Sequence, residues 1–551
     1  MPTSEASTHR SGHVDTFCRD ALPPRELWPQ IDCSSLSYPE TLNCATELLD
    51  NMASRHGART AIFYSGGLWS YAQLLEAANR IAHVLVEDFG IIPGNRILLR
   101  APNSPMLAAC WFAVLKAGGV AVCTNPLLRE RELVEIIPKA AVNLILTDAR
   151  LAEDCERTAD KLSNGKPHPN IACFNTNDAD SLESRMRSKP SGFKNCPTSQ
   201  EDVAIIAFTS GTTGQSKGTM HFHRDLLAVA DTFSRFVLQP DANDIFCGSP
   251  SLAFTYGLGG LLLFPFRWGA TTVLLEQGTP PNLLQGIQDH RATICFTSPT
   301  GYRAMLKHVR DFDLSSLKKC VSAGEHLSAA TFESWRQATG LKIIDGIGST
   351  EMLHMFISSS GNDIRPGATG KIVRGYHAKV VDEGGREVPP GTIGRLAVRG
   401  PTGCRYLNNP EQQKKYVQSG WNFTNDSFHI DEDGYFWYHA RTDDMIVSSG
   451  YNISAVEIEN VLLTHPKVAE CAVIGVPDPD RGQIVKAFIV PASGMAGNAG
   501  MAKELQDFVK AEIAPYKYPR AVEFRPTLPR NANGKLQRYR LRDNSIENEN
   551  H

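Results

Sequence analysis

The stretch FTSGTTGQSKGTMHF, from Phe208 to Phe222, decides the fold, and it directly follows the apolar run Val203–Ala207. Its fifteen residues include three glycines, four threonines, two serines and one lysine. Glycine permits positive φ and a close approach of the backbone to a ligand, and exposed backbone N–H groups form a concave anion site. Hydroxyl groups and one ammonium group add further donors. We therefore predict a loop at the end of a buried strand that binds a polyphosphate.

This loop is not a Walker P-loop, because Ser216 stands where that motif has its second glycine and Gly218 follows Lys217 in place of Ser or Thr. The expected chemistry is nevertheless the same, with Gly211, Gly214 and Gly218 supplying the conformational freedom. The residues expected to contact phosphate are Thr209, Ser210, Gly211, Thr212, Thr213, Gly214 and Lys217. A flexible surface linker is the alternative, and the preceding buried strand and the many hydroxyl groups argue against it.

Length and charge limit the classes of function. A chain of 551 residues exceeds one ordinary hydrophobic core, so two or more domains are expected. Hydrophobic residues make up 42% and charged residues 21%, as in soluble globular proteins. With a net charge of -3, the molecule has no general attraction to nucleic acid or to an acidic membrane, and we expect neither as a partner.

The 13 cysteines form no C-x-x-C pair and no Cys/His cluster, so we predict neither a zinc site nor a disulfide framework. An odd number of cysteines fits a reducing compartment. The N-terminal residues lack an apolar signal segment, and no apolar run is long enough to span a bilayer. We expect a cytoplasmic protein that is a monomer or a homodimer.

Apolar β-branched runs alternate with helical patterns, which predicts an α/β fold with mainly parallel strands. Strands are expected at 60–64, 96–101, 120–125 and 142–148, helices at 70–88 and 106–119, and antiparallel strands within 377–400. Beyond Arg441 the pattern changes to a compact α+β unit, with helices at 454–465 and 501–513 and strands at 468–478 and 484–491. We therefore predict two domains, residues 1–442 and residues 443–551.

The segment TSGTTGQSKG, residues 209–218, matches throughout the phosphate loop [ST]-S-G-[ST]-T-G-x-[ST]-K-G of the superfamily of acyl/aryl-CoA synthetases, peptide-synthetase adenylation domains and luciferases. The chain is identified as a member of this adenylate-forming superfamily, and further motifs follow in the family's order over most of its length. The resemblance implies a large N-terminal domain of parallel and mixed sheets flanked by helices, with a β-barrel-like subdomain. It also implies a small α+β C-terminal domain that moves on a hinge.

The segment DGIGSTEM, residues 345–352, resembles the family's [YF]-G-x-[ST]-E motif. The resemblance implies that Asp345 and Gly346 contact the nucleotide, that Thr350 contacts phosphate and that Glu351 binds Mg²⁺. A hard cation held by few carboxylates and several phosphate oxygens is what Mg²⁺ chemistry favours. An isolated glutamate is usually a solvated surface charge, but the preceding strand and the surrounding Gly-Ser-Thr residues favour a ligand here.

Two further segments resemble the adenosine-binding motifs. SAGEHL, residues 322–327, resembles the segment that stacks on adenine, here through Gly324 and Glu325. The region 425–446 resembles the T-G-D…G-R-x-D-D motif, which implies that Asp426 accepts the ribose hydroxyls and that Arg441 reaches ribose or phosphate.

That region departs from the motif at two positions. Asn425 and Ala440 replace glycines, so the backbone can differ there although no functional side chain is lost. Asp443 occupies the hinge position, where a few residues absorb the φ/ψ change between two working states.

The C-terminal motifs bring in coenzyme A and a catalytic lysine. SSGYNISAVEIE, residues 448–459, resembles the segment that lines the pantetheine tunnel, with Gly450 beside the thiol arm. LPRNANGKLQR, residues 528–538, resembles the P-[RK]-x-x-x-G-K motif, with Lys535 as the catalytic lysine. A lysine in a polar loop is ordinarily only solvated. Lys535, however, follows the other family motifs in their expected order, which favours a catalytic role.

The resemblance implies two half-reactions. A carboxylate attacks the α-phosphate of ATP to give acyl-AMP and pyrophosphate, and a thiolate of coenzyme A then displaces AMP. Lys535, Lys217, Mg²⁺ and the N–H groups of the loop are expected to stabilise the charge that develops in the first step. No covalent nucleophile is required, and the sequence contains no G-x-S-x-G motif.

The segment AFTYGLGGLLLFPF, residues 253–266, lies where the family places its acyl pocket. YGLG, SAGE and GSTEMLH resemble the benzoate-CoA ligase branch, which includes 2-aminobenzoate-CoA ligases. The residues that this resemblance places at the acid are Thr255, Tyr256, Gly257, Phe264 and His354. Leu261–Leu263 are expected to be ordinary core.

Thr255 stands where benzoate ligases usually carry alanine. Its hydroxyl narrows the slot and offers a partner to an ortho substituent, a discrimination worth about 1–3 kcal/mol. This favours an aromatic acid such as 2-aminobenzoate, followed by benzoate or a hydroxybenzoate. Three alternatives remain: an adenylation protein that loads a carrier protein, a non-catalytic relative that binds acyl-AMP, and a luciferase-like oxygenase.

Overall fold

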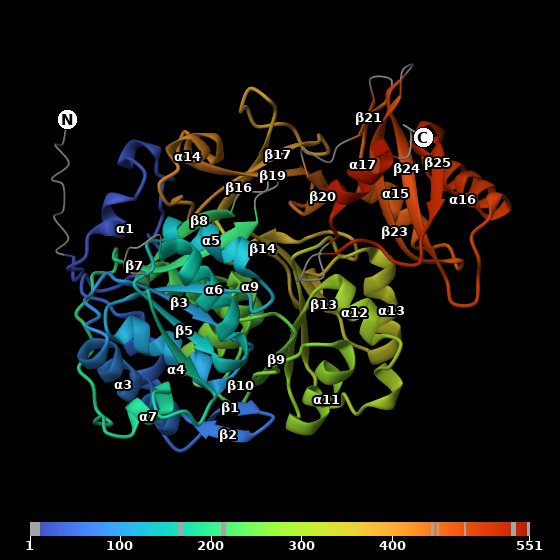
Figure 1. Ribbon diagram of the computed structural model, residues 1–551. Coiled ribbons are helices and arrows are strands. Elements are labelled where there is room, and N and C mark those ends of the chain that lie inside the picture. The colour runs from blue at the N-terminus through green and yellow to red at the C-terminus, as the bar shows by residue number, and fades with distance from the viewer. Residues whose placement is uncertain are drawn as a thin grey trace.

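The computed structural model describes residues 11–163, 169–210, 216–441, 446–448, 451–478, 481–530 and 536–547. It is a mixed α/β structure with a large N-terminal part and a smaller C-terminal part (Figure 1). The predicted fold class is confirmed. The predicted domain boundary at Asp443 lies outside the described residues and stays a prediction.

The phosphate loop belongs to a six-stranded sheet with the order β6-β5-β3-β4-β7-β8. Its strands are β3 (Arg96–Arg100), β4 (Val120–Thr124), β5 (Leu144–Asp148), β6 (Asn170–Phe174), β7 (Val203–Ser210) and β8 (Ser216–Phe222). The strands from β6 to β7 pair in parallel, as predicted, and β8 pairs antiparallel with β7 at the edge. The described residues of the glycine-rich stretch therefore belong to two antiparallel strands that pair as far as Ser210 and Ser216.

The second sheet has nine strands in the order β15-β14-β13-β12-β11-β9-β10-β1-β2. Its strands are β1 (Thr60–Tyr64), β2 (Gly67–Ser70), β9 (Ile245–Gly248), β10 (Thr271–Val273), β11 (Ile294–Thr297), β12 (Lys319–Ser322), β13 (Ile343–Gly348), β14 (Met355–Ser358) and β15 (Lys371–Ile372). The central pairs are parallel, and β2, β14 and β15 are antiparallel at the two edges. Buried parallel strands explain why these segments read as continuous apolar runs.

Helices cover both sheets. They include α3 (Tyr71–His83), α4 (Pro105–Lys116), α5 (Glu130–Lys139), α6 (Ala152–Ser163), α7 (Leu182–Met186), α8 (His223–Val229), α11 (Pro280–His290), α12 (Pro299–Met305) and α13 (Ala329–Thr339). Helix α3 begins with a capping box between Ser70 and Gln73 and continues as a π-helix over Val84–Asp88, which together match the predicted helix. Every residue of α4 is buried, which explains its uniformly apolar sequence.

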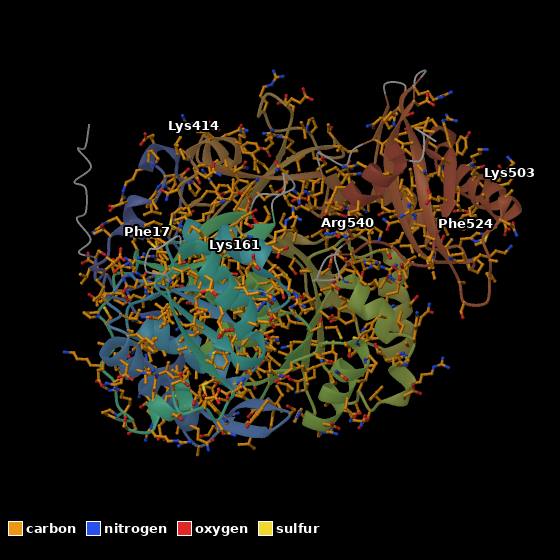
Figure 2. The ribbon with its side chains drawn as sticks, viewed as in Figure 1. Phe17, Lys161, Lys414, Lys503, Phe524 and Arg540 are labelled. Atoms are coloured by element: carbon orange, nitrogen blue, oxygen red, sulfur yellow. The ribbon has the colours of Figure 1, made fainter. Side chains whose placement is uncertain are left out.

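The β-barrel-like subdomain expected from the family is seen as a five-stranded antiparallel sheet. It comprises β16 (His377–Val381), β17 (Gly394–Arg399), β18 (Val417–Gln418), β19 (Trp421–Ile430) and β20 (Phe436–Arg441), with α14 (Pro410–Tyr416) before β18. Figure 2 shows Lys414 of α14 at the surface, where it is exposed.

The C-terminal part has its own sheets and its own apolar core. Its elements are β21 (Ile446–Ser448), β22 (Tyr451–Ile453), α15 (Ala455–Leu462), β23 (Val468–Asp478), β24 (Gly482–Pro491), α16 (Ala499–Glu512), β25 (Ala521–Phe524) and α17 (Arg538–Glu547). These match the predicted α+β unit. Across the described ranges of the chain, no helix is long and apolar enough to cross a membrane, and every cysteine is a free thiol.

A buried ion pair joins the phosphate hairpin to the segment that leads into α14. Met220 of β8 donates its backbone N–H to Arg405 O (2.8 Å), and Leu407 donates to Gly218 O (2.9 Å). The Arg405 guanidinium lies 3.0 Å from Asp225 Oδ2 in α8, and neither side chain is exposed. The ring of Phe222 lies under the guanidinium carbon at 4.1 Å. A buried charge of this kind depends on its partner.

We expect Arg405→Met to lower the free energy of unfolding by about 3–5 kcal/mol, because it removes the hydrogen-bonded cation of the buried Asp225 carboxylate and leaves Arg224, 3.8 Å away, as the remaining guanidinium. Urea denaturation followed by tryptophan fluorescence measures the change. The double variant Arg405→Met/Asp225→Asn should recover much of the loss. Arg386→Met is the matched control, since Arg386 pairs with Asp382 while 86% exposed. Equal effects of Arg405→Met and Arg386→Met would contradict the expectation.

Candidate active site

The phosphate hairpin is described up to its tip. Thr209 of β7 lies directly opposite Lys217 of β8. Gly218 has no positive φ; a Cβ there would lie 3.1 Å from Cγ2 of Ile206 and 3.2 Å from the Phe208 ring. Glycine at 218 therefore serves close approach between the strands, and the conformational freedom expected of it is not used.

Several predicted site residues lie outside the described residues, and the predictions for them stand as made. They are Gly211, Thr212, Thr213, Gly214, Asp443, Gly450 and Lys535. Ser210 is described as the last residue of β7.

A tight turn presents Thr350 and Glu351. Met352 donates its N–H to Ser349 Oγ (3.2 Å), and Leu353 donates its N–H to Thr350 O (3.1 Å). Leu353 has a φ of 69°, a conformation that costs a leucine on the order of 1–3 kcal/mol. Its side chain is 1% exposed in the main core, which offsets this strain. Burial of the Leu353 side chain therefore holds the turn in a strained backbone conformation.

Two side chains connect this turn to the phosphate hairpin. His221 of β8 donates from Nε2 to Thr350 O (2.8 Å), and burial lowers its pKa to about 4, so the ring is neutral. Tyr406 donates its hydroxyl to Glu351 Oε1 (2.7 Å), and its backbone pairs with Thr219 of β8. The sequence reasoning did not single out His221 or Tyr406, since neither contact is local along the chain.

The segment predicted to stack on adenine and the segment with Asp345, predicted to contact the nucleotide, start on neighbouring strands. Ser322 and Asp345 are directly opposite in β12 and β13. Gly324 has a φ of 92°, which requires glycine in practice. The Glu325 carboxylate accepts from the Thr300 hydroxyl (2.6 Å) and from the Thr300 N–H (3.3 Å) at the start of α12.

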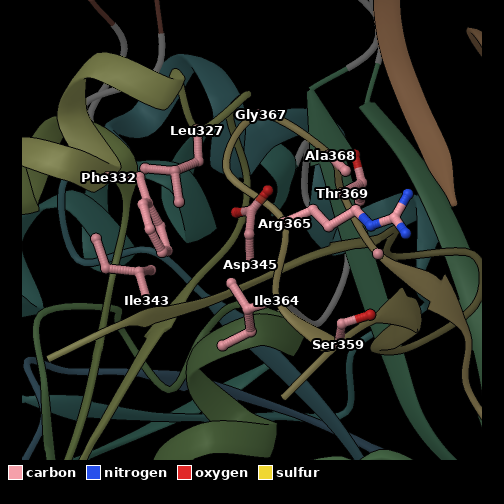
Figure 3. A pocket seen from close by; sticks show the side chains of 11 residues that line it. Leu327, Phe332, Ile343, Asp345, Ser359, Ile364, Arg365, Gly367, Ala368 and Thr369 are labelled. Atoms are coloured by element: carbon pink, nitrogen blue, oxygen red, sulfur yellow. The ribbon is translucent and has the colours of Figure 1, made fainter. Parts of the chain in front are cut away.

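A small pocket opens beside these segments (Figure 3). Asp345 and Leu327 lie in its wall, and the Asp345 carboxylate faces the interior. Burial raises the pKa of Asp345 well above its usual range, while the nearby Ser322 hydroxyl and the Gly346 backbone favour its charged form. A raised pKa favours the protonated carboxyl group, which can both donate and accept a hydrogen bond at the edge of a heterocyclic ring.

The predicted ribose residues come together. Asp426 of β19 and Arg441 of β20 are directly opposite, with Arg441 Nε 3.7 Å from Asp426 Oδ1. Asn425 adopts a φ of 56°, so it keeps a left-handed backbone where the family usually has glycine. Asparagine tolerates this region better than other side chains. The substitution therefore preserves a glycine-like bend beside Asp426.

Three of the residues predicted to bind the acid form one aromatic cluster. The His354 ring lies 4.6 Å from Phe264 and 5.7 Å from Tyr256, centroid to centroid. The Tyr256 hydroxyl donates to the carbonyls of Thr297 and Val321 (3.1 Å each), so its ring is fixed as a wall. Leu261–Leu263 are fully buried in the core, as expected.

His354 is the polar group of this cluster. It is 3% exposed, and within the described residues no hydrogen bond of ordinary geometry reaches Nδ1 or Nε2, while the backbone of Tyr256 lies close enough to favour the protonated ring weakly. Burial lowers its pKa to about 3, so the imidazole is neutral and offers one donor and one acceptor. Buried polar atoms in native proteins nearly always have hydrogen-bond partners, so the His354 ring retains the capacity for a further hydrogen bond.

The two remaining predicted residues differ in surroundings. Thr255 is the first residue of α9 (Thr255–Leu258) and is partly exposed. Gly257 is buried, and a Cβ there would lie 2.1 Å from Ser251 O, so it allows close packing of the backbone. After α9 the chain passes through a π-helix over Gly259–Leu263 into α10 (Phe264–Trp268). Such π-helical turns occur often at functional sites.

Comparisons with known proteins agree with this arrangement. Residues 49–406 match the family model of the AMP-binding enzyme, and residues 457–535 match the AMP-binding enzyme C-terminal domain. The chain is 33% identical to the benzoate-CoA ligase of Thauera aromatica, over 92% of this chain and 97% of the relative.

Solved structures agree as well. The anthranilate CoA ligase AuaEII in complex with anthranoyl-AMP is similar with a TM-score of 0.88 and 34% identity, covering 93% of this chain and 99% of that chain. A benzoate CoA ligase from Burkholderia xenovorans LB400 is similar with a TM-score of 0.84 and 32% identity, covering 91% of this chain and 100% of that chain. The chain therefore belongs to the AMP-binding enzyme family, in the benzoate-CoA ligase branch of the adenylate-forming enzymes.

Proposed function

We propose that the protein is an ATP-dependent aryl-CoA ligase whose acid carries a polar ring substituent, with 2-aminobenzoate as the best candidate. The observation that carries this substrate class is the buried, neutral His354 ring within an aromatic wall, which has no well-formed hydrogen bond at either nitrogen in the described part of the chain. We place the ring of a flat aromatic acid beside Tyr256 and Phe264, where an amino or hydroxyl substituent would supply a hydrogen bond to His354. The similarity to an anthranilate CoA ligase supports the same choice.

In the first half-reaction, the carboxylate of the acid attacks the α-phosphate of ATP and pyrophosphate leaves. The phosphate hairpin with Thr209 and Lys217 holds the triphosphate, Gly324, Glu325 and Asp345 bind the adenine end, and Asp426 with Arg441 binds the ribose. Lys535 stabilises the charge that develops at the α-phosphate. Because the groups are positioned beforehand, no covalent enzyme intermediate is needed.

The second half-reaction forms the thioester. The thiol of coenzyme A attacks the carbonyl carbon of the aryl-AMP, and AMP leaves. The C-terminal part turns about Asp443, which withdraws Lys535 and brings Gly450 beside the pantetheine arm.

Glu351 suits Mg²⁺. In the described part of the chain, its Oε1 accepts from Tyr406 and Oε2 accepts no hydrogen bond, so one oxygen stays open for a cation. One carboxylate together with phosphate oxygens is a typical Mg²⁺ environment. When bound, the ion neutralises charge on the phosphates, and Tyr406 holds the carboxylate that binds it.

We expect 2-aminobenzoate to exceed benzoate in kcat/KM by about tenfold or more, since a site built for a hydrogen bond disfavours an analogue that lacks it. Fatty acids should be poorer substrates. The measurement is AMP release with coenzyme A over a panel of ring-substituted benzoates and straight-chain acids, with the CoA thioester identified as the product. His354→Phe should bring the ratio between 2-aminobenzoate and benzoate close to one.

His290→Phe is the control, because His290 stacks on Phe63 of β1, outside the cluster of Tyr256, Phe264 and His354. A preference for unsubstituted benzoate or for a fatty acid would overturn the substrate assignment. Acyl transfer to a carrier protein without a CoA thioester would instead favour the adenylation protein as the function.

Tyr406→Phe should weaken the binding of Mn²⁺ in the presence of a non-hydrolysable ATP analogue by about tenfold, since the hydrogen-bond partner of a metal-binding carboxylate fixes its orientation. An electron paramagnetic resonance titration of free Mn²⁺ measures this without turnover. Tyr71→Phe, which loses a buried hydroxyl bonded to Ala270 O, is the control. Unchanged Mn²⁺ affinity in Tyr406→Phe would rule out this role.

A further inference from the structure

The segment predicted to stack on adenine also contacts the C-terminal part of the molecule. Two consecutive residues of Ser322–Leu327 are involved. The Asn460 amide of α15 lies 3.1 Å from Nε2 of His326, and Arg530 reaches Glu325. Burial lowers the pKa of His326 to about 4, so this ring stays neutral and accepts from the amide. Figure 1 shows the orange and red C-terminal elements beside α12 and α13.

Arg530 bridges the two parts of the chain. One guanidinium nitrogen lies 3.5 Å from Glu325 Oε1 and 3.3 Å from Thr300 Oγ1, in the N-terminal part. The other lies 2.7 Å from Glu470 Oε2 on β23, in the C-terminal part. The side chains of Arg530 and Glu325 are 24% and 18% exposed. Glu470 alone would pair the guanidinium within its own domain, so the contact with Glu325 and Thr300 is an additional one that crosses between domains.

The position of Arg530 in the chain gives this contact its significance. Arg530 and Leu536 pair as an antiparallel bridge, with residues 531–535 between them. Those residues lie outside the described part, and they include Lys535, the predicted catalytic lysine. Arg530, five positions before Lys535, thus contacts the segment expected to hold adenine.

We propose that Arg530 is a positioning residue that holds the C-terminal domain in the arrangement for the first half-reaction, through its bridge between Glu470 and the pair Glu325 and Thr300. The inference rests on the proposed two-step function. Losing the bridge favours other domain arrangements, so the first half-reaction slows and the second does not. A residue that only stabilises its own domain would affect both steps alike.

The test compares wild type with Arg530→Gln in separate half-reactions. Adenylation is followed by exchange of labelled pyrophosphate into ATP with the preferred aryl acid, and thioester formation is followed from supplied aryl-AMP and coenzyme A. We expect adenylation to fall about 5- to 20-fold, with thioester formation changed less than about twofold, as for a shift in population between two arrangements. Hydrogen–deuterium exchange should rise at the start of α12 and around residue 470 in Arg530→Gln, independently of turnover.

Arg525→Gln is the matched control, because Arg525 pairs with Glu523 inside the C-terminal domain at a similar exposure. It should leave both half-reactions and the exchange at α12 unchanged. Equal loss of both half-reactions in Arg530→Gln, or no loss in either, would overturn the proposal. Absence of pyrophosphate exchange in the wild type with every acid would instead overturn the proposed function.

Discussion

Backbone pairing between β8 and residues 405–407 is the constraint on which the site depends. It sets Tyr406 in place to reach Glu351, and the neighbouring Arg405 is locked by Asp225 in the helix that follows β8. His221, from the same strand, holds the carbonyl of Thr350. The phosphate hairpin and the turn with Thr350 and Glu351 therefore cannot shift independently. A site that handles phosphate and a cation together needs this fixed relation, because catalysis by charge stabilisation depends on groups placed in advance.

The predicted acid site differs from the phosphate site in the chemistry of its side chains. Its walls are aromatic and rigid, since Tyr256 is fixed by two carbonyls and Phe264 is fully buried. Within them His354 remains neutral because burial disfavours its charged form. Under the proposed function, the aromatic walls favour a flat ring and the one uncharged polar group favours a polar substituent on it. The residues predicted to bind the nucleotide at the ends of β12 and β13 are polar, so the two predicted substrate sites differ in chemical character.

Much of this architecture could be predicted from sequence, because apolar runs such as Thr60–Tyr64 and Arg96–Arg100 carry their own strand signal. The family motifs also indicated Thr350, Glu351, Asp426 and His354. The antiparallel pairing of β7 and β8 was not predicted, because a glycine-rich sequence does not indicate whether a helix or a strand follows it. Tyr406 was missed because it meets Glu351 only through the tertiary fold. At Asn425 the sequence showed a departure from the motif, and only its φ showed that the backbone bend is retained.

Leu353 joins the core to the chemistry in a way that restricts which residues the position tolerates. A glycine would relax the left-handed backbone but would empty the space that the leucine side chain fills, and a β-branched residue would fill that space at a higher backbone cost. Neither exchange improves packing and backbone geometry together. Leucine at 353 is thus a compromise between the best backbone conformation and the best side-chain packing. A substitution chosen there to raise thermal stability would disturb the alignment of Thr350 and Glu351.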